Sequence, residues 1–170
     1  MKIILATITL ALTFAARAAD LTVSITEVHL CCPSCVKGVA KAVADVPGLT
    51  AKADQDSGTV TLTGPDAATV QKGADALVAG GYFGKSSDAT IKLNADGGAK
   101  NQKVQSLKIE GVHLCCGKCV KAVSAALGTV SGVTGNTAAK GAKSFEVTGD
   151  FNDKDVLDAL QKAGLTGQEK

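Results

Sequence analysis

The chain alternates short stretches of period-two hydrophobicity with longer stretches of helical spacing. Apolar residues alternate with Thr and Ser over positions 21–26, which predicts a half-buried strand. Apolar residues then recur at helical spacing over positions 36–46, with Pro33 suited to the first turn and Pro47-Gly48 to the end of that helix. The first quarter of the chain therefore predicts a strand, a loop and a helix.

The same alternation continues to about position 94. A hairpin is expected around Asp56-Ser57-Gly58, and Asp66 can cap a second helix that ends at Gly80-Gly81. A last short strand is predicted through Ile91 and Leu93. The order β-α-β-β-α-β is that of a split βαβ, ferredoxin-like unit.

A second set of elements repeats this plan over residues 104–170. A strand through Leu107 and Ile109 precedes a helix that should stop near Gly132, and Asn152 caps a later helix. The remaining residues leave room for only a short or missing last strand, so the edge of the first strand should be open or covered by another segment or chain.

These patterns predict an α+β chain of two tandem ferredoxin-like βαββαβ sandwiches. The internal repeat favours two small domains over one larger domain. We place the first domain at 20–94 and the second at 104–170. Residues 95–103 lack periodicity and are rich in Gly, Ala, Asn and Lys, which predicts a flexible linker.

The first eighteen residues have the features of a secretory signal peptide. Lys2 supplies a positive charge, Ile3 to Ala16 form an apolar run, and Ala16-Arg17-Ala18 is a small-x-small cleavage site. The apolar run is shorter than the ~20 residues that a transmembrane helix needs. We therefore expect an exported protein, periplasmic or secreted, with no transmembrane segment after cleavage.

Charge and composition exclude some partners. The net charge of +2 comes from 18 basic and 16 acidic residues, and removal of Lys2 and Arg17 with the signal leaves 16 of each. A nucleic-acid partner would need a clustered basic face, and the absence of Trp with a single Tyr removes stacking surfaces. We expect no nucleic-acid partner.

All the cysteines and histidines of the chain lie in two copies of one motif. The first is His29-Leu30-Cys31-Cys32-Pro33-Ser34-Cys35, and the second, 84 positions later, is His113-Leu114-Cys115-Cys116-Gly117-Lys118-Cys119. Cysteines that serve only packing would be scattered among core positions. Concentration at two sites of identical spacing indicates metal ligands.

Each Cys-x-x-Cys pair should lie where a loop enters a helix. The unpaired N–H groups and partial positive charge of a helix N-terminus favour thiolate, the form that binds metal. Sulfur ligands select Cu(I), Zn(II) and, by the same softness argument, Hg(II). Two thiolates suit a low-coordinate ion such as Cu(I) or Hg(II) better than Zn(II), which prefers four ligands.

In its strand, Cys-x-x-Cys loop and helix, each unit resembles the heavy-metal-associated domain. Copper chaperones, the N-terminal domains of copper-transporting P-type ATPases and the periplasmic mercuric-ion-binding protein share that domain. The resemblance covers nearly all of both units, although the usual Gly-Met-Thr before the first cysteine is replaced here by His-Leu-Cys. It implies that the metal ligands are Cys32, Cys35, Cys116 and Cys119.

The resemblance also implies the partners and the packing around the site. A metal-transporting membrane protein or another metal-binding domain would exchange the ion with this chain, and no catalysis is involved. Tyr82 resembles a residue that packs near the metal loop in bacterial members, and Leu165 takes that place in the second unit.

Four residues of the motif have no counterpart in the family pattern: Cys31, Cys115, His29 and His113. In one interpretation they enlarge the site to three or four ligands. In the other, the cysteines replace Thr and point away from the site, and the histidines are surface or strand-end residues. The sequence leaves both open.

The favoured function is that of an exported protein that binds, transports or sequesters a heavy metal, with Cu(I) the preferred ion and Hg(II) or Zn(II) the alternatives. A thiol–disulfide redox protein is one competing hypothesis, because Cys-x-x-Cys is also a redox motif. An interaction module that uses the fold only as a scaffold is another. The tandem units could bind two ions separately or hold one between them.

Overall fold

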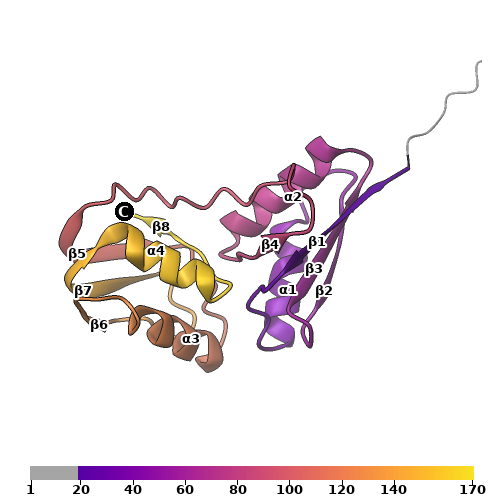
Figure 1. The fold of residues 1–170 in the computed structure, drawn as a ribbon. Coiled ribbons are helices and arrows are strands. Elements are labelled where there is room, and N and C mark those ends of the chain that lie inside the picture. Colours follow the sequence, from indigo (N-terminus) through magenta and orange to yellow (C-terminus); the bar gives the residue numbers. More distant parts are fainter. Residues whose placement is uncertain (1–18) are drawn as a thin grey trace, which may run out of the picture.

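The structure is a computed structural model that describes residues 19–170, and the predicted signal peptide at 1–18 lies outside them. It contains two ferredoxin-like units, each with a four-stranded antiparallel sheet and two helices (Figure 1). The fold class predicted from the sequence is confirmed. Within residues 19–170, no helix combines the length and hydrophobicity that crossing a bilayer requires.

The first unit has the strand order β2-β3-β1-β4. Its elements are β1 (Leu21–Thr26), α1 (Pro33–Ala42), β2 (Thr50–Asp54), β3 (Thr59–Gly64), α2 (Ala67–Ala79) and β4 (Lys85–Ser86). One sheet face carries the buried residues Val23, Ile25, Val60 and Leu62, while the alternating Thr and Ser of β1 and β3 are more exposed on the other face. The period-two pattern of the sequence thus sets which face the helices cover.

The second unit has the equivalent order β6-β7-β5-β8. Its elements are β5 (Lys103–Glu110), α3 (Gly117–Leu127), β6 (Val133–Asn136), β7 (Ser144–Asn152), α4 (Asp153–Lys162) and β8 (Gln168–Glu169). Helix α3 ends at Leu127 rather than near Gly132, although Val130 is still buried beyond its end. The predicted caps are confirmed: Asp66 accepts from the N–H of Thr69 at 2.7 Å, and Asn152 from that of Lys154 at 2.9 Å.

The predicted last strand of the first unit through Ile91 and Leu93 is wrong. Strand β4 lies earlier and pairs with β1, with Lys85 opposite Thr26. The side chain of Gln71 on α2 donates to the carbonyl of Lys92 at 2.7 Å and accepts from its N–H at 2.9 Å. These two bonds hold the segment against the helix, so the buried Ile91 packs from a loop and not from a strand.

The second unit has the short last strand that the sequence predicted. Strand β8 pairs with Ile109 and Glu110 of β5, so it covers part of the edge that was otherwise expected to be open. Both units end in a strand of two residues, so the shortness is common to the two copies.

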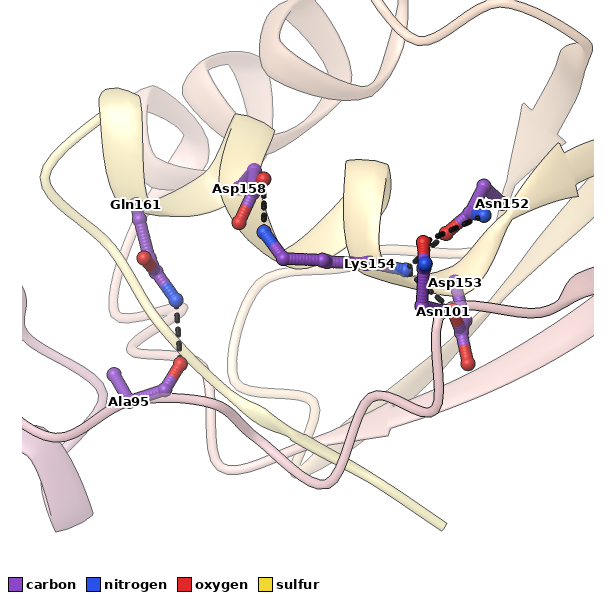
Figure 2. Close-up of polar contacts among 7 residues, drawn as sticks. All are labelled: Ala95, Asn101, Asn152, Asp153, Lys154, Asp158 and Gln161. Atoms are coloured by element: carbon purple, nitrogen blue, oxygen red, sulfur yellow. Dashed lines mark hydrogen bonds and ion pairs between the residues drawn. The ribbon is translucent and has the colours of Figure 1, made fainter.

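The connecting segment 95–103 runs beside α4 in the structure (Figure 1). Figure 2 shows Gln161 donating to the carbonyl of Ala95, and Asn152 donating to Asn101 at 3.1 Å. The buried carboxylate of Asp153 accepts from the backbone N–H groups of Lys100 and Gln102, both at 2.8 Å. The segment is therefore bonded to the second unit at both of its ends; its flexibility stays a prediction.

The two units contact each other through equivalent turns that follow α2 and α4. Tyr82 and Leu165 form an antiparallel β-bridge. The carbonyl of Gly164 accepts from the N–H groups of His29 and Phe83, at 3.1 and 3.2 Å, and the N–H of Thr166 donates to the carbonyl of Gly81 at 3.1 Å. This contact brings the two cysteine loops face to face.

Candidate metal centre

The two Cys-x-x-Cys pairs occupy the same place in the two units. Cys32 is the N-cap residue of α1 and Cys116 that of α3, each in extended conformation. Cys35 and Cys119 follow in the first helical turn and are fully buried. The two sulfurs are 3.7 Å apart in the first pair and 3.8 Å apart in the second. Each pair thus converges at a helix N-terminus, as the sequence predicted.

All six sulfurs meet in one cluster between the units. Cys31 Sγ lies 3.4 Å from Cys116 Sγ and 3.5 Å from Cys119 Sγ. The equivalent contacts of Cys115 Sγ are 3.6 Å to Cys32 Sγ and 3.5 Å to Cys35 Sγ. Cys31 and Cys115 therefore point into the cluster, each toward the opposite unit. All six cysteines are free thiols.

The two histidines are placed differently from each other. The Nε2 atoms of His29 and His113 are buried, and neither has a hydrogen-bond partner. A ring nitrogen of His29 lies within 4.8 Å of the sulfurs of Cys31 and Cys119. The His113 ring stacks on Tyr82, with 4.7 Å between centroids. Of the two histidines, His29 therefore lies close enough to these cysteines to share an ion with them.

Tyr82 packs against the first cysteine loop and is hydrogen-bonded to it. Its hydroxyl donates to the carbonyl of Cys35 at 2.9 Å, and its ring is buried. Gly38 on α1 makes room for this contact, because a Cβ there would lie 2.1 Å from the tyrosine oxygen and 2.7 Å from His113 Cε1. Leu165, also fully buried, takes the equivalent position in the second unit.

The cysteines differ in the direction in which their pKa is shifted. The pKa is lowered at the two N-cap cysteines, Cys32 and Cys116, and raised at Cys31, Cys115 and Cys119. The backbone N–H of Cys119 is the main cause that lowers the pKa of Cys116 to about 6. Burial opposes a similar effect at Cys32, but the N–H of Cys35 and neighbouring thiols still lower its pKa. Burial, with the neighbouring thiols, raises the pKa of Cys31 and of Cys115. Burial also raises the pKa of Cys119 and lowers that of both histidines.

The sulfur spacing fits soft-metal binding by more than two ligands per ion. Sulfurs bonded to one ion at about 2.3 Å lie ~3.8 Å apart in a tetrahedron, ~4.0 Å apart in a planar triangle and ~4.6 Å apart in a line. The closest pairs of sulfurs lie 3.4–4.0 Å apart, and several of these pairs join the two units. The arrangement therefore suits ligand sharing better than two separate linear sites.

Comparison with known proteins supplies no family assignment. No protein-family model matches the sequence, and curated proteins give no match either. The solution structure of the N-terminal soluble domains of Bacillus subtilis CopA is similar at 18% identity, with 89% of this chain and 95% of that chain covered and a TM-score of 0.30. The first two RRM domains of yeast poly(U) binding protein Pub1 give 8% identity, 88% and 98% coverage, and a TM-score of 0.26.

Both TM-scores are too low to indicate a shared arrangement, so the fold assignment rests on strand order and helix placement. The structure brings together all the cysteines that the sequence singled out, together with His29, and it places His113 against Tyr82. The sequence indicated Gly81 only as part of a helix end and did not show that Gly81 and Gly164 contact the opposite unit, although their equivalent positions after the second helix of each repeat were a usable signal.

Proposed function

We propose that this protein binds Cu(I) through the six-cysteine cluster and serves to hold or sequester the ion outside the cytoplasm. The main support for this proposal is that the sulfurs of the two units contact each other. These contacts include Cys31 and Cys115 as well as the two Cys-x-x-Cys pairs. Thiolate ligands favour soft ions such as Cu(I), which also accepts fewer ligands than Zn(II). Hg(II) and Zn(II) are the competing ions.

Burial supports retention of the ion. Cys35 and Cys119 have no exposed surface, and the other four cysteines are half-buried between the units. An acceptor protein would therefore reach the sulfurs of Cys35 and Cys119 only after the units separate. An open Cys-x-x-Cys loop on a single domain would exchange its ion faster. Binding of this kind requires no catalytic group, and we propose no enzymatic activity.

Metal loading of the reduced protein tests this proposal. Samples prepared without oxygen are loaded separately with Cu(I), Zn(II) and Hg(II), dialysed against a chelator and analysed for metal. We expect Cu(I) to be retained and Zn(II) to be lost first. The variant with all six cysteines changed to Ser is the control for adventitious binding. Failure of the reduced protein to retain any of the three ions would contradict the proposal.

Export is tested separately. The residues at 1–18 support a cleavable leader, so the protein recovered outside the cytoplasm should begin near Ala19. N-terminal sequencing of protein from fractionated cells measures this. Full-length protein found with the cytoplasmic fraction would exclude export and leave metal binding unaffected.

A further inference from the structure

We infer that the six sulfurs form one polynuclear site, in which each sulfur bridges two Cu(I) ions and about four ions are bound per chain. This inference rests on the proposed function and extends it from binding to the structure of the bound cluster. It differs from the interpretation in which each unit binds its own ion.

The contacts among the sulfurs are those of an octahedron. Nine pairs lie 3.4–4.0 Å apart. Three further pairs lie within 4.8 Å: Cys31–Cys32, Cys32–Cys116 and Cys115–Cys116. The three pairs that remain have no residue in common: Cys31–Cys115, Cys32–Cys119 and Cys35–Cys116. An octahedron has twelve edges and three pairs of opposite corners. The twelve close pairs of sulfurs correspond to the edges, and the three remaining pairs correspond to the opposite corners.

An octahedron offers triangular faces but no tetrahedral set. Any four of its six vertices include at least one opposite pair, so no four of these sulfurs are all neighbours. Two Zn(II) ions bridged by Cys35 and Cys119 would need Cys35 close to Cys116 and Cys32 close to Cys119. Those are opposite pairs. A three-coordinate ion such as Cu(I) therefore fits this set better than Zn(II), which prefers four ligands.

Four triads of neighbouring sulfurs use every cysteine twice. Three of them have all their sulfurs within 4.8 Å: Cys31-Cys32-Cys116, Cys32-Cys35-Cys115 and Cys115-Cys116-Cys119. The fourth is Cys31-Cys35-Cys119, with separations of 3.7, 3.5 and 4.0 Å. One ion per triad gives four ions and twelve metal–sulfur bonds, two at each sulfur.

Charge also favours several ions. Six thiolates with two monovalent ions would retain about four negative charges in a half-buried site, whereas four ions would leave about two. Formation of the cluster releases to solvent the protons of those cysteines that are still thiols, and Cys116 is already a thiolate above about pH 6. The N-termini of α1 and α3, where Cys32 and Cys116 lie, partly offset the remaining negative charge.

Two glycines hold the units in the position that makes this cluster. Gly81 has φ +84°, and a Cβ there would lie 2.4 Å from the carbonyl oxygen of Gly111. Gly164 has φ +74°, and a Cβ there would lie 2.4 Å from the carbonyl oxygen of Glu27. Each glycine thus contacts the chain just before the cysteine loop of the opposite unit. Any side chain at these positions would push the two loops apart.

Native mass spectrometry during Cu(I) titration of the reduced protein tests the inference. We expect the four-copper form to appear while metal-free protein remains, because bridging makes binding cooperative. Forms with one and two ions that fill in sequence, with saturation at two, would overturn the cluster and leave the proposed function intact. Absence of any copper form would overturn both.

Matched variants separate the cluster from the individual pairs. Gly81→Ala and Gly164→Ala should each reduce copper at saturation about twofold and abolish the cooperative four-copper form. Gly98→Ala is the control, because Gly98 has φ +83° and open space where its Cβ would lie. Cys31→Ser with Cys115→Ser gives the same test without altering the backbone: two ions per chain are expected, and four would contradict the inference.

Discussion

The two units carry the same cysteine loop but support it differently. In the first unit the Tyr82 hydroxyl lies against Gly38 and donates to the carbonyl of Cys35. In the second, Leu165 and Ala122 occupy the corresponding positions, and no such bond is possible. The sulfurs nevertheless make equivalent contacts in both directions across the interface.

The difference shows that the cysteine arrangement does not depend on one particular set of supporting residues. The spacing of the motif and the helix N-terminus place the sulfurs, while the residue behind the loop tunes the packing of each unit. Equivalent substitutions in the two units should therefore differ in their effects on stability and thiol reactivity. They should have equal effects on metal binding.

The largest expected effect comes from the two central sulfurs. Cys35 and Cys119 each contact four other cysteines within 4.0 Å, including each other. Cys35→Ser and Cys119→Ser should each lower bound Cu(I) by more than half, and to the same extent, in metal analysis of reduced protein. Ser34→Ala, at an exposed position of the same loop, is the control. Loss of only one unit's copper in each variant would indicate independent sites.

The next effect concerns Tyr82, which distinguishes the two units. Tyr82→Leu gives the first unit the residue of the second, but it leaves a cavity over Gly38 and removes the bond to Cys35. We expect the free energy of unfolding of the reduced, metal-free protein to fall by about 2 kcal/mol in denaturant titration. Leu165→Met, a change of similar volume, should cost less than ~1.5 kcal/mol. Equal effects of the two variants would contradict the asymmetry.

A smaller effect is expected at Asp153, which has no equivalent at Ala67, the first residue of α2. Asp153→Asn removes charge-assisted bonds from the N–H groups of Lys100 and Gln102. We expect a loss of about 1–2 kcal/mol in stability and faster hydrogen exchange at those two amides. Asp155→Asn, on the exposed side of the same turn, is the control. Unchanged exchange would show that the segment is held by other contacts.

The smallest effect is a pH dependence that differs among the thiols. Because the folded pKa of Cys116 is lowered to about 6 from 9.0, Cys116 is a thiolate in the folded protein, and a thiol in the unfolded protein, between these values. Its contribution to stability is complete above pH 9 and is lost as pH falls through about 6. Timed alkylation with iodoacetamide at pH 7 should modify Cys116 first and Cys31 and Cys115 last. Early modification of Cys31 would contradict this order.

Most of the fold could be predicted from the sequence, because each unit is built from local periodicity. The strand with Val23 and Ile25, the helix caps and the repeat were all visible in it. The last strand of the first unit was misplaced, because the side chain of Gln71 decides where Lys92 lies and no periodicity reports that bond.

The sequence predicted the cysteines of the candidate site within each unit, but it did not predict the contacts that join the two units. The motif identified all six cysteines, but it gave no sign that Cys31 would contact Cys116 or that Cys115 would contact Cys35. Those contacts depend on how two units dock, and docking depends on the Tyr82–Leu165 bridge and on close backbone approach at Gly81 and Gly164. Such contacts join residues far apart in the chain, so the pattern within either repeat does not contain them.

The most direct test of a shared site is copper K-edge X-ray absorption on the reduced protein loaded with Cu(I). If the six sulfurs form one cluster, each copper is surrounded by three sulfurs and has another copper as a near neighbour. Two sulfurs around each copper, with no copper neighbour, would show that the units bind metal separately and would contradict the shared cluster.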